Sequence, residues 1–162
     1  MVKKNKIALF VDTSTTSTPA WKRIKKSTEL TIAANPETEE YDFIADEAPT
    51  TELKSYNPQI EQPLKMIEGE DDFEYFWDKF YGLPTGEDAK TQLLLVYVFD
   101  KTTVGSTDHY KAWKVDATIV MNELNAVDSE LNFNLNFAGD IAEGYATVTD
   151  GVPTWEASLP SA

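Results

Sequence analysis

The chain has 162 residues, no cysteine and a formal net charge of −14. Its 41% apolar and 26% charged residues are ordinary for one globular domain, which excludes wholesale disorder. The lack of cysteine excludes disulfides and thiol catalysis. The longest apolar run, LLLVYVF at 93–99, is far shorter than the ~20 residues of a membrane span, and the start of the chain predicts no signal peptide.

The charge is unevenly distributed along the chain. Residues 1–26 contain seven Lys or Arg and one acid, Asp12, a net charge of +6, whereas residues 27–162 sum to −20. An acidic body disfavours a nucleic-acid grip, because phosphate binding needs Lys and Arg. The basic segment either attracts an acidic partner, including a second copy of the chain, or is a solvated tail.

Strand patterns predominate. The short apolar run at 6–11 predicts a strand, and the run at 93–99 predicts a strand buried on both faces. Period-two alternation predicts further strands at 28–34, 39–45, 59–68, 112–124, 130–137 and 143–158. Pro63 places its strand at an edge or a bulge, and Asp150-Gly151 predicts a hairpin turn.

One segment has helical periodicity. Over 71–81, the aromatic residues fall at i, i+3, i+4 and i+7, on one face of a helix: Phe73, Phe76, Trp77 and Phe80. Acids at 70–72 favour the first turn, and Gly82 fits the C-terminal cap. We expect this stripe to pack on a sheet. The predicted fold is mainly β, a β-sandwich or open barrel with one flanking α-helix.

Weakly structured stretches lie at 12–20, 45–58 and 100–110. The first two are long for connectors inside a small domain, and long ordered loops usually bind something. We therefore expect a single domain, 1–162, that uses long loops and arms in assembly. These are an N-terminal arm (1–20), a long loop (45–58) and a C-terminal arm (155–162).

The sequence offers no catalytic site. His109 is the one histidine and is expected at the surface, and the acidic run at 68–72 lacks the spacing of a calcium loop. Exposed tryptophans such as Trp21, Trp113 and Trp155 would suit a sugar-stacking platform, although the last two lie on alternating strands. We expect no enzyme, no cofactor and no metal.

The strand at 130–137, ELNFNLNF, has an unusual polar side. Leu131, Phe133, Leu135 and Phe137 alternate with Asn132, Asn134 and Asn136. A solvent-facing strand usually carries Thr, Lys or Glu, and Asn is depleted in strands. The pattern therefore predicts a buried apolar face opposite a flat row of uncharged amides.

Four stretches, which together cover most of the chain, carry a resemblance to a known family. They are KIALFV…PAWKRIKKSTELTIAANPETEEYDFI, TTELKSYNPQIEQPLKMIEGEDDFEYFW, LLLVYVF and ELNFNLNFAGDIAEG. In this order of strands, loops and acidic-capped helix, the chain resembles the major tail tube proteins of long, non-contractile-tailed bacteriophages. We expect no additional C-terminal immunoglobulin-like module of the kind that some members carry.

The resemblance implies a structural protein of the virion tail, assembled in the host bacterial cytoplasm. Members form six-subunit rings that stack into a hollow tube, through which double-stranded DNA passes without specific binding. The implied partners are further copies of the chain and the tape-measure, tail-tip and tail-terminator proteins, with no membrane.

The tube gives two sets of residues a role. Contact with the next ring would involve Lys22, Arg23, Lys25 and Lys26, whose sign is complementary to the acidic body. The amides of Asn132, Asn134 and Asn136 would line the lumen, since basic residues there would hold phosphates. Alternatively the amides face outside solvent or a neighbouring subunit. Other functions left open are a tube of a phage-tail-like bacteriocin or of a contractile or secretion system, and a monomeric carbohydrate-binding β-sandwich.

Overall fold

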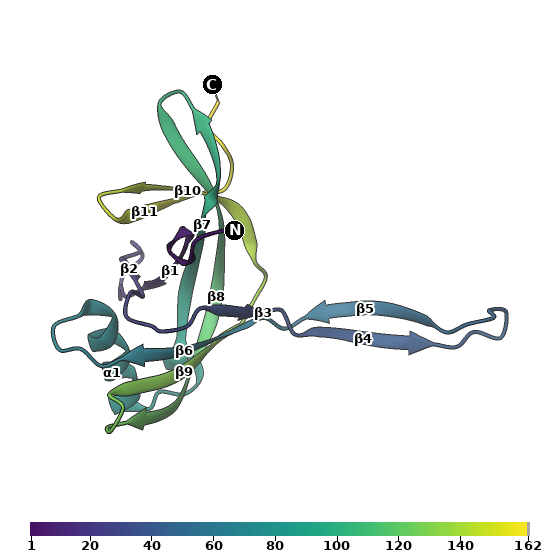
Figure 1. Cartoon of the computed structure of the whole chain (residues 1–162), viewed down its shortest axis with the longest axis horizontal. Helices are drawn as coiled ribbons and strands as arrows, with labels where there is room; N and C mark the ends of the chain where they lie inside the picture. The colour runs from purple at the N-terminus through teal and green to yellow at the C-terminus, as the bar shows by residue number, and fades with distance from the viewer. Residues whose placement is uncertain (162) are drawn as a thin grey trace.

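The computed structural model describes residues 1–161, which form one nine-stranded antiparallel sheet, a separate two-stranded ribbon and one α-helix (Figure 1). The sheet contains β1 (Ile7–Asp12), β2 (Trp21–Arg23), β3 (Thr31–Ala33), β6 (Gln59–Lys65), β7 (Lys90–Val104), β8 (Thr107–Asn125), β9 (Glu130–Phe137), β10 (Ala142–Thr149) and β11 (Val152–Glu156). The ribbon contains β4 (Pro36–Tyr41) and β5 (Thr50–Tyr56), and the helix is α1 (Asp71–Gly82). Short 3-10 turns cover Lys4–Lys6 (η1) and Gly86–Ala89 (η2).

The sheet is open. Its order is β2-β1-β7-β8-β9-β6-β3, so the outer edges of β2 and β3 carry no further strand of the described chain. The long strand β8 pairs with β10 over residues 110–114 and with β9 over 117–125, so two strands follow one another along a single edge. The predicted mainly β fold with one helix is confirmed, and the sheet does not close into a barrel.

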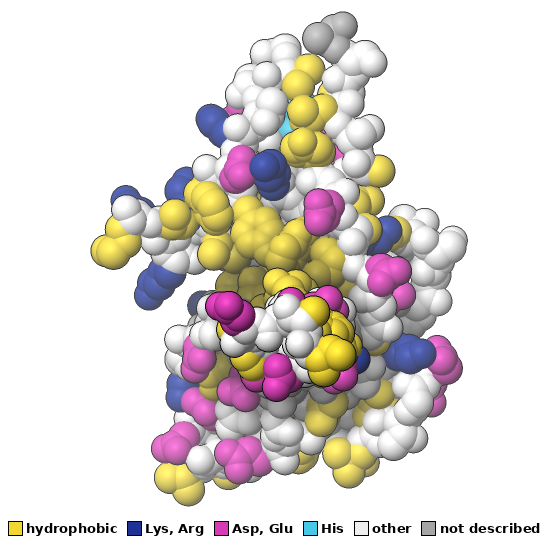
Figure 2. Space-filling view, turned by 90° about the vertical axis from the view of Figure 1, so that its right-hand side faces the viewer, with side chains coloured by type: hydrophobic (Ala, Val, Ile, Leu, Met, Phe, Trp, Pro, Cys, Tyr) yellow, Lys and Arg dark blue, Asp and Glu magenta, His cyan; other side chains and the backbone are white. Residues whose placement is uncertain are grey.

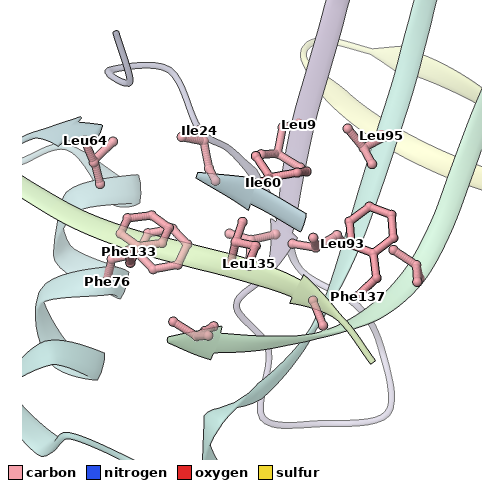
Figure 3. Packing of buried hydrophobic residues seen from close by; sticks show 14 of the residues in the cluster. Leu9, Ile24, Ile60, Leu64, Phe76, Leu93, Leu95, Phe133, Leu135 and Phe137 are labelled. Atoms are coloured by element: carbon pink, nitrogen blue, oxygen red, sulfur yellow. The ribbon is translucent and has the colours of Figure 1, made fainter. Parts of the chain in front are cut away.

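Strand β7 is buried on both faces, as its apolar run predicts. Leu93 and Leu95 belong to the larger core, together with Phe133 of β9 (Figure 3). Leu94 and Val96 point to the opposite face, where they join a smaller core with residues of β1, β8 and β10. A strand of this kind needs cover on both sides, and the other elements are arranged to supply it.

Helix α1 covers the larger core through Phe76. This side chain is fully buried and stacks on Phe133, with ring centroids 4.0 Å apart (Figure 3). Phe73 and Phe80 are half-buried against the same core, as predicted. The prediction for Trp77 is wrong: its side chain is 38% exposed and packs along the helix on Phe80, with centroids 6.2 Å apart.

The helix is rotated relative to the predicted stripe because Asp72 occupies its buried face. This carboxylate is 2% exposed, and its Oδ2 accepts hydrogen bonds from the backbone N–H groups of Lys25 (2.9 Å) and Lys26 (3.1 Å). The helix end is also one residue later than predicted. Leu83, with φ of 43°, takes the left-handed cap position, and Gly82 is the last helical residue.

Two predicted loops differ in outcome. The stretch 12–20 leaves the sheet, and Asp12 organises it by accepting hydrogen bonds from the backbone N–H groups of Ser14 (2.9 Å) and Ala20 (3.0 Å). Burial raises the pKa of Asp12, but these bonds and that of the Ser14 hydroxyl outweigh it, so the pKa is lowered. Residues 100–110, by contrast, are not a loop, because β7 and β8 continue to a tight turn at Gly105.

The expected terminal arms are partly built into the sheet. Of residues 1–20, Ile7–Asp12 form β1, whose side chains are mostly buried. Of residues 155–162, the first two belong to β11, which closes a hairpin at Asp150-Gly151 as predicted. Residue 162 lies outside the described residues.

His109 is not at the surface. It is 3% exposed, and its Nδ1 lies 2.8 Å from Oε2 of Glu156. This contact joins β8 to β11 around a buried imidazole, so the prediction of a surface histidine is wrong.

We expect the two aromatic residues of α1 to differ in their effect on stability. Phe76→Ala should lower the free energy of unfolding by about 3–5 kcal/mol, because it opens a cavity beside Phe133. Trp77→Ala removes a side chain that solvent already reaches, so its effect should be clearly smaller. Urea unfolding measures both, and an equal or larger effect at Trp77 would contradict the packing described.

Candidate assembly surfaces

A two-stranded arm, residues 36–56, projects from the sheet (Figure 1). Two predictions are corrected here: the strand predicted at 39–45 ends at Tyr41, and half of the loop predicted at 45–58 is strand β5. The cause is that β5 is mostly polar on both sides, with Leu53 and Tyr56 as its large apolar residues, so it lacks the alternation that identifies a half-buried strand. The 36–56 segment is called the arm below.

The arm has no core of its own. Every residue of β5 is exposed, and in β4 only Glu39 and Tyr41 are half-buried. Polar contacts across the ribbon include an ion pair between Lys54 and Glu39 and a hydrogen bond from the Ser55 hydroxyl to Glu37. An isolated two-stranded hairpin is at best marginally stable in water, so a ribbon of this length gains from packing on another surface.

The tip of the arm is apolar within an acidic surround. Ile44 is fully exposed, Phe43 is 51% exposed, and the Phe43 ring stacks on Tyr41 with centroids 5.6 Å apart. Asp42, Asp46 and Glu47 flank these side chains, and the whole arm has seven acids and one lysine. Large exposed apolar side chains gathered at the end of a projection mark a protein-contact site.

The open sheet edges are a second feature suited to assembly. Within the part of the chain that the structure describes, β2 pairs with β1 alone, β3 with β6 alone and β11 with β10 alone. Unpaired N–H and C=O groups at such edges can pair with a strand of another chain.

The amide row of β9 lies on the polar side of the sheet. Asn132, Asn134 and Asn136 are half-buried, and the predicted alternation with buried Leu131, Phe133, Leu135 and Phe137 is confirmed. The Asn134 Oδ1 accepts from Asn122 Nδ2 (3.0 Å), and Asn132 Nδ2 donates to Glu123 Oε1 (3.1 Å). The neighbouring strands place Glu61 beside Asn134 and Gln59 beside Asn136.

This surface, called the amide face below, is therefore hydrogen-bonded across strands and carries amides and carboxylates. Glu29, Glu61 and Glu123 line a shallow hollow on it together with Asn132 and Asn134.

The basic residues predicted to contact a neighbour are attached to the body. Lys22 forms an ion pair with Asp71 (3.4 Å), and Arg23 lies on β2 with a long hydrogen bond to the Asn5 carbonyl (3.5 Å). Lys25 and Lys26 have exposed side chains on a backbone held by Asp72. Lys22, Lys25 and Lys26 are thus held beside the N-terminus of α1.

The residues that sequence reasoning missed are those of the arm tip. Phe43 falls in the predicted strand 39–45, and its neighbour Ile44 breaks the alternation of that strand. This break was the available signal that the strand ends and that both side chains are exposed.

Among residues 1–161, no group of His, Cys, Asp or Glu is placed to hold a metal ion. No helix in the same part of the chain is both long and apolar enough to cross a membrane.

Comparison with known proteins gives little. No family model and no curated protein matches the chain. Among solved structures, the chain is similar to one in the cryo-EM structure of the anti-feeding prophage (AFP) baseplate, 6-fold symmetrised. The identity is 8%, the match covers 85% of this chain and 89% of that chain, and the TM-score is 0.41. A likeness this weak carries no inference about function.

We expect the arm to be the least protected β-structure in the isolated chain. Amide hydrogens of β4 and β5 should exchange fast, because no buried apolar contacts hold the ribbon closed, whereas those of β7 should exchange slowly. Hydrogen exchange followed by mass spectrometry compares the two segments. Equal protection in the monomer would show that the arm is stable by itself and needs no partner surface.

Proposed function

We propose that the chain is a structural virion protein, without catalysis, that polymerises into a tail tube. In this proposal six copies form a ring, rings stack into a hollow tube, and double-stranded DNA passes through it. The protein's main partner is itself, and the tape-measure, tail-tip and tail-terminator proteins implied by the resemblance contact the finished tube.

The observation that carries the proposal is the exposed arm. A solvated ribbon of 21 residues, 36–56, with an apolar tip is costly for a monomer, which gains nothing from ordering it. On another copy, the same tip buries Phe43 and Ile44. The arm is therefore suited to join successive rings.

The sheet edges suit contact within a ring. An edge strand on one side of the molecule and a different edge on the other form a head-to-tail interface, which closes into a ring when the rotation per subunit allows it. Pairing β2 of one copy with β3 or β11 of the next would also remove the aggregation hazard of the open edges.

The amide face suits the wall of a DNA duct. Amides and carboxylates are wetted and do not displace counterions from phosphates, so duplex DNA slides past without being held. In this arrangement Asn132, Asn134 and Asn136 face the lumen. Lys25 and Lys26, on the body near α1, face an acidic neighbouring subunit, with Lys22 and Arg23 at the rim of that contact.

One observation favours a second function. Tyr97, Phe99, Trp113 and Tyr145 line a hollow beside β7, β8 and β10, and aromatic side chains of this kind stack on sugar rings. Figure 2 shows hydrophobic side chains gathered in a hollow above the arm, which points at the viewer. The alternative of a different class is a monomer that binds a polysaccharide. A tube of a tail-like bacteriocin or secretion system would have the same architecture as the main proposal but belong to another particle.

The apolar tip provides the test of polymerisation. The purified chain should sediment as long polymers at high concentration. The double variant Phe43→Ser/Ile44→Ser should form nothing larger than a single ring, with an unchanged melting temperature, because both side chains are exposed. Val127→Ser, a matched change at a side chain that is 93% exposed in the β8–β9 turn, should polymerise normally. A tip variant that polymerises like the parent would overturn the role of the arm, and binding of monomers to a polysaccharide column would favour the second function.

The amide face provides the test of the duct. Tubes of the triple variant Asn132→Lys, Asn134→Lys and Asn136→Lys should retain duplex DNA, and salt should release it. The control adds the same charge at three exposed positions elsewhere, Tyr81→Lys, Val127→Lys and Val152→Lys. If intact tubes of the two variants retain equal amounts of DNA inside the tube, the amides lie away from the lumen.

A further inference from the structure

We propose that the arm tip of one copy docks into a basic, apolar groove on a second copy, lined by Val2, Lys3, Lys6, Phe99, Lys101 and Tyr110. The inference deepens the proposed function, because it rests on self-assembly and names the surface that receives the arm. The six residues are called the basic groove below.

The groove exists because β7 outruns its neighbour. β1 pairs with β7 as far as Ile7 and Tyr97, so no strand formed by residues 1–161 lies on that side of the remainder of β7. Pairing with β8 also shifts between Tyr97 and Lys101, and within this irregular stretch Phe99 is 50% exposed. The turn η1 lies beside this unpaired segment and places Lys3 and Lys6 next to Val98 and Phe99.

The charges of the tip and the groove are complementary. The tip presents Asp42, Asp46 and Glu47 around Phe43 and Ile44. The charged side chains that line the groove are all lysines: Lys3, Lys6 and Lys101. Among the described residues, Lys3 and Lys6 form no ion pair, whereas Lys101 is paired with Asp108 at 3.1 Å. An apolar centre with a charged rim on each partner gives both affinity and register.

The other hollows fit an acidic tip less well. The aromatic hollow has Asp100 and Glu143 beside a single Lys111. The hollow of the amide face carries Glu29, Glu61 and Glu123, which would repel the tip. A fourth hollow, near the C-terminal end, carries Glu156 in contact with His109.

The contact must join different copies. In Figure 1 the arm extends away from the sheet, and its tip is far from the N-terminus and from the upper part of β7. A tip on one surface and a groove on another form a heterologous contact, which repeats from copy to copy until it closes or continues as a filament. A self-complementary dimer is not the arrangement expected.

Because the chain has no cysteine, introduced thiols can report the contact without background. The variant Ile44→Cys/Val2→Cys, treated with a short bismaleimide, should give a ladder of covalent oligomers. The control Ile44→Cys/Val127→Cys places the second thiol at a more exposed position, 93% against 52% for Val2, and should still give almost none. A mixture of the two single variants at Ile44 and Val2 should stop at dimers, as expected for a link between copies.

Charge reversal tests the same contact in a second way. Lys3→Glu/Lys6→Glu and Asp42→Lys/Asp46→Lys should each abolish polymerisation, and the combined four-residue variant should restore it. Lys101 is left unchanged because it already pairs with Asp108. Circular dichroism of each variant establishes that it folds. If all three variants fold but the four-residue variant does not polymerise, the pairing of tip and groove is overturned.

The outcomes separate the two proposals. If the parent forms tubes but Ile44→Cys/Val2→Cys cross-links no more than its control, the docking of the tip into the basic groove is overturned and the tube proposal stands. If Ile44→Cys/Val2→Cys gives a ladder of covalent oligomers but electron micrographs contain no tubes, the docking stands and the tube proposal is overturned. A purified chain that neither polymerises nor cross-links overturns both.

Discussion

Strand β7 is apolar on both faces, and the rest of the molecule is arranged to cover it. On one side β6, β9 and helix α1 complete the larger core, with Phe76 stacked on Phe133. On the other side β1, β8 and β10 bring Phe10, Ala112 and Ala146 over Leu94 and Val96. Burial of this strand supplies the main stabilisation of a sheet that remains open at its edges.

The apolar residues are largely used for this cover, and what remains exposed is informative. The arm departs from the sheet without a core, yet it carries two of the exposed large apolar side chains at its end, Phe43 and Ile44. The cover also ends before β7 does, which leaves Phe99 exposed among lysines. One surface is acidic and projecting, and the other is basic and recessed. The uneven charge of the sequence, +6 over residues 1–26 against −20 elsewhere, thus has a spatial counterpart.

Sequence reasoning predicted those elements whose periodicity reflects one buried face. β9 alternates strictly because Phe133 and Leu135 face the core, and α1 repeats its aromatics because one side covers that core. The orientation of α1 was mispredicted at Trp77, since a buried carboxylate, Asp72, is satisfied by backbone N–H groups from a distant segment. No local pattern reports such a contact. His109 is buried for the same kind of reason, through Glu156 on another strand.

The arm could not be predicted from periodicity, because neither of its strands has a buried face. Alternation arises where one face is buried, and β5 has none, so its Thr, Glu and Ser residues appear loop-like. The basic groove has no sequence signature either, because it brings η1 together with the far end of β7. The asparagine row was identified from its composition, while its surroundings, Asn122, Glu61 and Glu123, depend on the register of three strands.

The central claim is that this chain assembles with itself into a hollow tube. Electron microscopy of the purified, unmodified protein at high concentration tests it most directly, over a range of salt and temperature. The account predicts long hollow polymers with six subunits in each ring and an open central channel. Solely monomers or closed dimers under all these conditions would contradict it.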